Sequence, residues 1–165
     1  MNKTKSLLLG LGCLSLSFGS FAEDEAMTVQ VKRLSMATAQ SMAQAAVTAC
    51  EKEGIQIGVT VVDRNGIPQA VLRNTVAPPI TLPISKDKAY AAVMFNVPTS
   101  QLADRANTPI GRVPGVVMSA GAVPVLVGGS LLGAIGVSGA PTGETDEMCA
   151  QAGLDAVIDD LEMEE

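Results

Sequence analysis

The stretch from Val123 to Gly139 constrains the fold of this chain more than any other. Two apolar runs rich in valine and isoleucine flank Gly128-Gly129, and a Gly-Gly pair supplies the positive φ angles that a tight hairpin turn requires. Both runs are almost continuously apolar, which is typical of strands that are buried on both faces. The stretch therefore predicts a β-hairpin that other parts of the protein cover on both sides.

A helix and a second hairpin are predicted before it. Ser35 is placed to cap a helix in which apolar residues, mostly alanine, recur at helical spacing, and Gly54 is a typical residue to end it. Residues 55–63 and 67–73 predict two strands. The turn between them at residues 64–66 contains Asn-Gly, which hairpins favour.

The rest of the chain adds helices and one more strand. Residues 74–83 hold three prolines and are expected to be irregular, after which a helix capped by Ser85 runs to about Phe95. A shorter helix is predicted over 98–106, a short strand over 116–118, and a last helix over 144–161. The order is helix, two strands, two helices, three strands and helix. Antiparallel hairpins covered by helices predict an α+β fold.

The two end helices suggest how they pack. The buried face of the first is mostly alanine, and the last presents the small residues Cys149, Ala152, Gly153 and Ala156. If the two helices lie antiparallel on one face of the sheet, Cys50 faces Cys149. An even pair of cysteines in an oxidising compartment favours a disulfide, and the alternative is two buried free thiols.

The N-terminus is typical of a secretory signal. Lys3 and Lys5 precede an apolar stretch, and Ser20-Phe21-Ala22 is a small-x-small cleavage site. We therefore expect residues 1–22 to be removed, residues 23–33 to form a polar lead-in, and residues 34–165 to form one domain that is periplasmic or extracellular. Lipid anchoring at Cys13 is the alternative, although the residues before it fit a lipoprotein site poorly.

Charge and composition exclude some partners. Loss of Lys3 and Lys5 lowers the net charge from −6 to −8, so little would neutralise nucleic-acid phosphates, and 2% aromatic content leaves few stacking platforms. No later stretch is apolar enough to span a membrane. Nucleic acid and membrane are therefore not expected partners.

The candidate chemistry is restricted because the chain has no histidine. This removes the commonest metal ligand and the usual general base, so neither a catalytic residue nor a metal site is predicted. Lys88 and the single tyrosine, Tyr90, lie on the predicted middle helix, with Met94 one turn beyond Tyr90. Arg105 and Arg112 flank an irregular loop, where they could face an anionic ligand. Each of these side chains also has an ordinary structural interpretation.

Four stretches taken together resemble the GlcG/HbpS-like haem-binding family, and the resemblance covers about residues 34–161. They are Gly58–Gly66, Ser85–Ala92, Gly133–Ala140 and Asp146–Leu154. The resemblance implies a profilin-like domain, with a five-stranded antiparallel sheet and helices on both faces, that forms homo-oligomers. It also implies binding of haem or a related tetrapyrrole.

Without histidine, the iron ligand would have to be Tyr90, Met94, Met118, Lys88 or a hydroxyl group; tyrosine and methionine do serve as haem ligands. The function we expect is non-enzymatic binding of haem or a similar small planar ligand, next to the middle helices and the loop 107–121. One alternative is an enzyme that degrades or modifies such a ligand. The other is an accessory or assembly module without a small-molecule ligand.

Overall fold

The structure, a computed structural model, describes residues 26–164. The signal peptide predicted for residues 1–22 lies outside the described residues. Residues 26–30 form neither helix nor strand, and the compact unit described below begins at Val31. Across the described part of the chain, every helix is too short or too polar to cross a bilayer.

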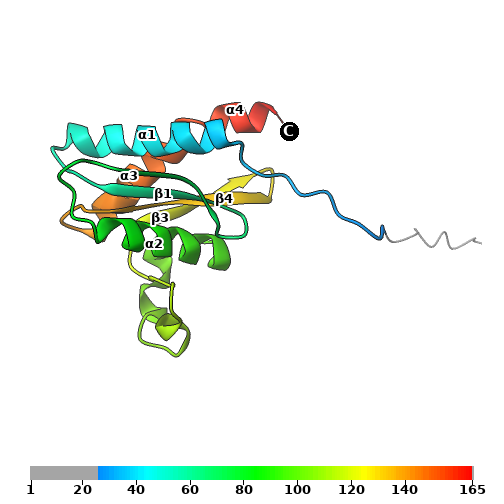
Figure 1. The fold of residues 1–165 in the computed structure, drawn as a ribbon. Helices are drawn as coiled ribbons and strands as arrows, with labels where there is room; N and C mark the ends of the chain where they lie inside the picture. Colours follow the sequence, from blue (N-terminus) through cyan, green and yellow to red (C-terminus); the bar gives the residue numbers. More distant parts are fainter. Residues whose placement is uncertain (1–25, 165) are drawn as a thin grey trace, which may run out of the picture. The chain divides into compact units, whose positions relative to one another are not determined.

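The centre of the unit is a four-stranded antiparallel sheet in the order β2-β1-β4-β3 (Figure 1). Its strands are β1 (Gly58–Asp63), β2 (Pro68–Arg73), β3 (Ala122–Val127) and β4 (Ser130–Ser138). The central strands β1 and β4 pair from Gly58 opposite Ser138 to Asp63 opposite Gly133. Every residue of β1 is buried, including Thr60 and Asp63 as well as its three valines.

The predicted hairpin of residues 123–139 is confirmed as β3 and β4. Its turn is Gly128-Gly129, with φ of 51° and 79°, the backbone that Gly-Gly readily adopts and other residues avoid. The earlier hairpin is confirmed as β1 and β2. There the buried Asp63 organises the turn, because its Oδ1 accepts hydrogen bonds from the backbone N–H groups of Asn65 and Ile67, both at 2.9 Å.

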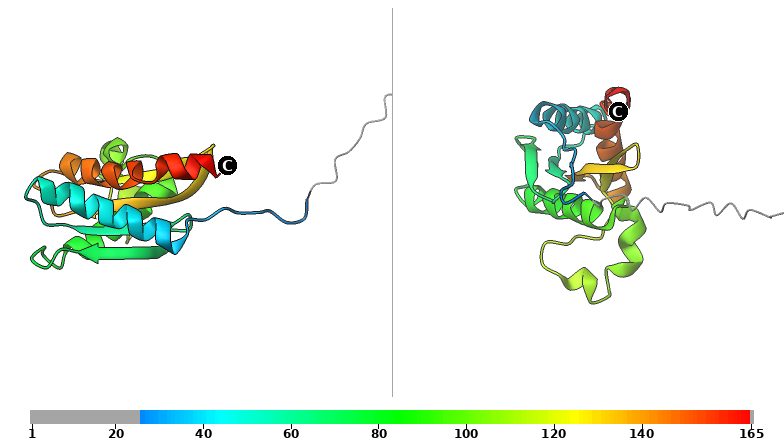
Figure 2. Two further views of the ribbon diagram at one scale, coloured as in Figure 1. Left: turned by 90° about the horizontal axis from the view of Figure 1, so that it is seen from above. Right: turned by 90° about the vertical axis from the view of Figure 1, so that its right-hand side faces the viewer.

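The first and last helices pack side by side on one face of the sheet, as predicted (Figure 2). Helix α1 (Met36–Lys52) begins at Ser35, whose Oγ accepts a hydrogen bond from the N–H of Thr38, and it ends before Gly54 at φ 74°. Helix α3 (Gly143–Asp155) approaches α1 closely, since a Cβ atom on Gly153 would lie 2.7 Å from the carbonyl oxygen of Met42. The predicted disulfide joins the two helices between Cys50 and Cys149.

The prediction of one continuous last helix over 144–161 was wrong. The chain leaves helical geometry at Val157, with φ −134° and ψ −7°, and resumes as the short helix α4 (Ile158–Met163). Val157 is itself buried in the core beneath α1 and α3. The break lets a β-branched residue pack inward between the two segments.

Helix α2 (Thr81–Phe95) covers the other face of the sheet. It lies directly on β4, because a Cβ atom on Gly136 would be 2.2 Å from the carbonyl oxygen of Ser85. The helix begins four residues before the predicted cap, Ser85. Pro83 falls in the first turn, where its missing N–H has no helical partner to lose. Ser85 is instead buried and bonds to Thr60 between helix and sheet, Oγ to Oγ1 at 2.9 Å.

Between α2 and β3, residues 97–121 form a lobe that projects below α2 in Figure 1. The lobe contains two 3₁₀ segments, η1 (Thr99–Arg105) and η2 (Ile110–Arg112), where a single short helix was predicted over 98–106. The fifth strand predicted over 116–118 is wrong for these residues. The N–H of Val117 donates to the carbonyl oxygen of Asp87 on α2, and Met118 is buried beside Ala91 and Leu102.

Candidate functional site

A pocket of about 290 Å³, which we call the Tyr90 pocket, lies where α2, the β1–β2 turn and the lobe meet. Its lining residues are Gly66, Ile67, Pro68, Lys86, Asp87, Tyr90, Pro114 and Gly115. Three separate segments supply its walls, so its shape depends on how the lobe sits against α2. The volume is at the lower end of the roughly 300–1,000 Å³ typical of small-molecule sites.

Tyr90 and Met94 come together at this pocket. They are four residues apart on α2 and so share one face of the helix. Both pack over Gly66, because a Cβ atom there would lie 2.4 Å from Cδ2 of Tyr90 and 3.2 Å from Cε of Met94. The Tyr90 ring is half-buried and Met94 is exposed. The Tyr90 hydroxyl makes no hydrogen bond to any described residue, so it can ligate or hydrogen-bond a bound molecule.

Asp87 gives the pocket a hydrogen-bond acceptor. Its Oδ1 is buried and accepts no hydrogen bond within residues 26–164, and Lys86 Nζ is 3.5 Å away. Gly115 of the lobe lies above this oxygen, with the position of its absent Cβ 4.0 Å away. The Lys86 ammonium lies within ion-pair distance of this oxygen, and a ligand N–H or O–H would add the hydrogen bond that the oxygen lacks.

Lys88 lies away from the Tyr90 pocket. Two residues along a helix rotate the side chain by roughly 200°, so Lys88 and Tyr90 occupy opposite faces of α2. Lys88 points into the protein, where its Nζ donates to Asp146 Oδ2 at 2.8 Å and to the carbonyl oxygen of Val137 at 3.2 Å. Asp146 Oδ1 also accepts a hydrogen bond from the N–H of Ala140. The buried pair joins α2 to α3 across the end of β4.

Burial raises the pKa of the Asp146 carboxyl above its ordinary value of 3.8, and the bonds from Lys88 and the Ala140 N–H oppose this shift. The folded protein therefore holds this proton more tightly than the unfolded chain does. The contribution to stability is greatest below pH 3.8 and is lost as the pH rises through the folded-state pKa. We expect ¹³C NMR of the Asp146 carboxyl to show a midpoint above 3.8. A midpoint below 3.8 would mean that Lys88 outweighs burial.

The other predicted ligand residues are dispersed over the lobe. Met118 is 4% exposed and packs with Ala91 and Leu102, so its sulfur is inside the protein. Arg112 is exposed on η2 and does not line the Tyr90 pocket. Arg105 lies over the ring of Phe95, 5.8 Å from its centroid. Of the six candidate residues, the structure brings together only Tyr90 and Met94.

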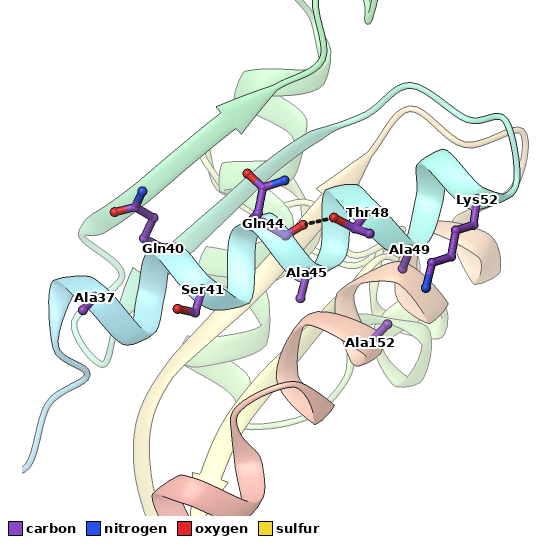
Figure 3. A pocket seen from close by; sticks show the side chains of 9 residues that line it. All are labelled: Ala37, Gln40, Ser41, Gln44, Ala45, Thr48, Ala49, Lys52 and Ala152. Carbon is purple, nitrogen blue, oxygen red and sulfur yellow. Dashed lines mark hydrogen bonds between the residues drawn. The ribbon is translucent and has the colours of Figure 1, made fainter.

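A second hollow, of about 740 Å³, runs along the outer face of α1 (Figure 3). Its lining side chains are small or polar, with Lys52 as the single charged one, and it contains none of the predicted ligand residues. Residues 26–164 contain no group of three or more Cys, Asp or Glu side chains that could hold a metal ion. No tyrosine or methionine side chain of the described residues lines this groove.

Sequence reasoning missed the residues that complete the site. Pro114 and Gly115 reach Tyr90 only because the lobe folds back onto α2, and no spacing in the sequence shows this. Asp87 precedes Tyr90 by three residues on the same helix, so helical spacing could have grouped these two. The Lys88–Asp146 pair joins residues 58 positions apart. Asp146 was not among the predicted site residues, yet its carboxylate is buried in an ion pair.

Comparisons with known proteins identify a family for this chain. The family described as "Haem degrading protein HbpS-like" matches residues 34–155. An uncharacterized 15.0 kDa protein from Citrobacter freundii is 31% identical over 134 residues, covering 76% of this chain and 93% of that protein. The crystal structure of HbpS is 39% identical with a TM-score of 0.76, covering 79% of this chain and 94% of that one. A PduOC:heme complex shares the fold at 24% identity and a TM-score of 0.69, covering 75% and 94%. The chain belongs to the HbpS-like family.

Proposed function

We propose that this protein binds haem or a related planar tetrapyrrole at the Tyr90 pocket without degrading or modifying it. We also propose that it is exported and acts as a homo-oligomer. The observation that carries the proposal is the position of Tyr90. Its phenol lines a pocket with both apolar and charged walls, and its oxygen has no hydrogen-bond partner among the described residues. A phenol oxygen is an established haem-iron ligand.

The residues at the pocket can contact one face of a haem group. Tyr90 is placed to supply an axial oxygen, and Ile67, Pro68 and Pro114 offer apolar contacts to a macrocycle. Met94 is the alternative iron ligand, because it is exposed beside Tyr90. Lys88 and Met118 fit poorly, since one is held in a buried ion pair and the other in a core cluster. The bound iron would supply the redox and ligand-binding chemistry, and this chain would supply its orientation.

Family membership and one structural neighbour support the ligand class. HbpS-like proteins are described as haem-degrading, and the PduOC:heme complex shows that a protein of this fold can hold haem. The Tyr90 pocket is smaller than a porphyrin, so a second subunit is a reasonable source of the remaining cover. Export is supported by the N-terminal sequence and by the disulfide, which persists in oxidising compartments.

A haemin titration of the chain lacking residues 1–22 tests the proposal. We expect a saturable shift of the Soret band, and the Tyr90→Phe variant, which keeps the ring and loses the oxygen, should raise the Kd at least tenfold, about 1.4 kcal/mol. Met118→Leu is the matched control and should bind as the wild type does. Wild-type affinity in Tyr90→Phe would exclude Tyr90 as the ligand. No Soret shift at micromolar haemin would contradict haem binding.

Two further measurements address the remaining parts of the proposal. Native mass spectrometry with and without haemin reports the number of subunits, and a mass for a single chain would contradict the homo-oligomer. The intact mass of the secreted chain reports whether residues 1–22 are removed. Because the matched family is described as haem-degrading, the bound haem should also be followed with a reductant or peroxide. Steady product formation would favour the enzyme instead.

A further inference from the structure

The two ends of the lobe meet at a single carboxylate on α3. Glu147 Oε2 accepts hydrogen bonds from the backbone N–H of Ser100, at 3.0 Å, and from that of Gly121, at 3.2 Å. Glu147 Oε1 accepts from the Ser100 hydroxyl at 2.6 Å. Ser100 lies near the start of the lobe and Gly121 is its last residue. One side chain thus holds both ends.

Next to this carboxylate, a buried threonine makes a second link between the ends. Thr99 Oγ1 accepts a hydrogen bond from the N–H of Ala122 at 2.9 Å and lies 3.4 Å from Glu147 Oε2. The carbonyl oxygen of Gly121 accepts from the N–H of Val137 on β4. Residues 99–100 and 121–122, which we call the neck of the lobe, are therefore attached to both the sheet and α3.

Beyond the neck, the lobe has few attachments to the rest of the protein. Its backbone bonds between residues 103 and 116 are local turns three residues apart, such as Ala106 to Ala103 and Val116 to Val113. The contacts that hold it on α2 are the 3.4 Å bond from the Val117 N–H to Asp87, the packing of Leu102 and Met118, and Arg105 over the Phe95 ring. A segment of this kind is at the low end of local stability, so its position depends on the neck.

The lobe also forms one wall of the Tyr90 pocket. Pro114 and Gly115 face the pocket from the lobe, whereas Gly66 and Tyr90 belong to the sheet and α2. We infer that Glu147 is a positioning residue that holds both ends of the lobe and so fixes the Pro114–Gly115 wall of the pocket. The ligand-binding part of this inference rests on the proposed function. The positioning part does not.

The test uses Glu147→Ala, Glu147→Gln and the matched control Glu144→Ala. Glu144 is exposed on the same helix, carries the same charge, and makes no hydrogen bond to another described residue. In Glu147→Ala we expect amide hydrogen exchange in the lobe to accelerate at least about tenfold, because hydrogen bonds to a charged group are lost, with the sheet amides unchanged. Glu147→Gln should retain most of the protection, since its amide oxygen can accept both backbone bonds.

Tyr90 provides a readout that needs no ligand. It is the single tyrosine, and the chain has no tryptophan, so intrinsic fluorescence reports on this pocket alone. We expect acrylamide to quench it more strongly in Glu147→Ala, and haemin to bind at least about tenfold more weakly. Glu144→Ala and Glu147→Gln should resemble the wild type in both measurements.

The outcomes separate the two claims. Unchanged lobe exchange in Glu147→Ala would overturn the inference, and so would faster exchange with unchanged quenching. If wild-type protein fails to bind haemin, the proposed function fails, while exchange and quenching still decide the role of Glu147. If the sheet amides of Glu147→Ala also lose protection, the test is repeated with Ser100→Ala, which removes only the hydroxyl bond. We then expect faster exchange in the lobe and stronger quenching of Tyr90, both smaller than in Glu147→Ala. The absence of these changes would overturn the inference.

Discussion

Replacing both bridging cysteines, as Cys50→Ala with Cys149→Ala, should lower the free energy of unfolding by up to about 4.7 kcal/mol. That is the chain-entropy estimate for a disulfide closing a loop of about 100 residues, and measured values are often smaller. The two cysteines are 99 positions apart and fully buried between α1 and α3. Urea unfolding followed by far-ultraviolet circular dichroism gives the difference.

Reduced wild-type protein is the control for this result. It keeps both sulfur atoms, so it separates the loss of the covalent link from the small cavity that alanine leaves at each position. We expect reduction to account for most of the destabilisation. The same urea midpoint for oxidised and reduced wild-type protein would show that the bridge does not stabilise the fold.

Lys88→Met should be destabilising by about 3–5 kcal/mol at pH 7, because it leaves the Asp146 carboxylate buried without its cation. The side chains of the pair are only 4% and 5% exposed. Removing Lys88 takes away the interactions that lower the pKa of Asp146, so that pKa rises further in the variant. The folded variant then binds the proton more tightly, and its deficit should shrink as the pH falls towards 4. Urea unfolding at both pH values measures this.

Two variants make the interpretation specific. Lys86→Met changes an exposed lysine on the same helix and should cost less than about 1 kcal/mol. Lys88→Met combined with Asp146→Asn removes both charges while an amide oxygen still accepts from the Ala140 N–H. We expect the double variant to recover much of the lost stability. A deficit in Lys88→Met that does not depend on pH would contradict the role assigned to Asp146.

Local chemistry was enough to predict much of the fold. Gly128-Gly129 and Ser35 act through their own backbone or side chain within a few residues, so the turn and the cap were readable directly. The small residues on one face of each end helix predicted that the two helices pack together with Cys50 opposite Cys149. Where the prediction failed, the deciding contact was distant. Val116 and Val117 have strand-like sequences but lie against α2, because the sheet already ends at β3.

The candidate site was less predictable for the same reason. Tyr90 and Met94 are four residues apart, so helical spacing was sufficient to group them. Lys88 is nearer to Tyr90 in sequence than Met94 is, yet its side chain is committed to Asp146 on another helix. The contribution of Pro114 and Gly115 depends on the path of the whole lobe. Such contacts between separate segments leave no periodic signal in the sequence.

The close contact between the backbone of α2 and Gly136 of β4 separates the two surfaces of this helix. Main-chain atoms of helix and strand meet there, so any side chain at Gly136 would push the helix away from the sheet. Tyr90 and Met94 lie on the opposite, outward surface of α2, so substitutions there change the wall of the Tyr90 pocket without touching this contact with β4.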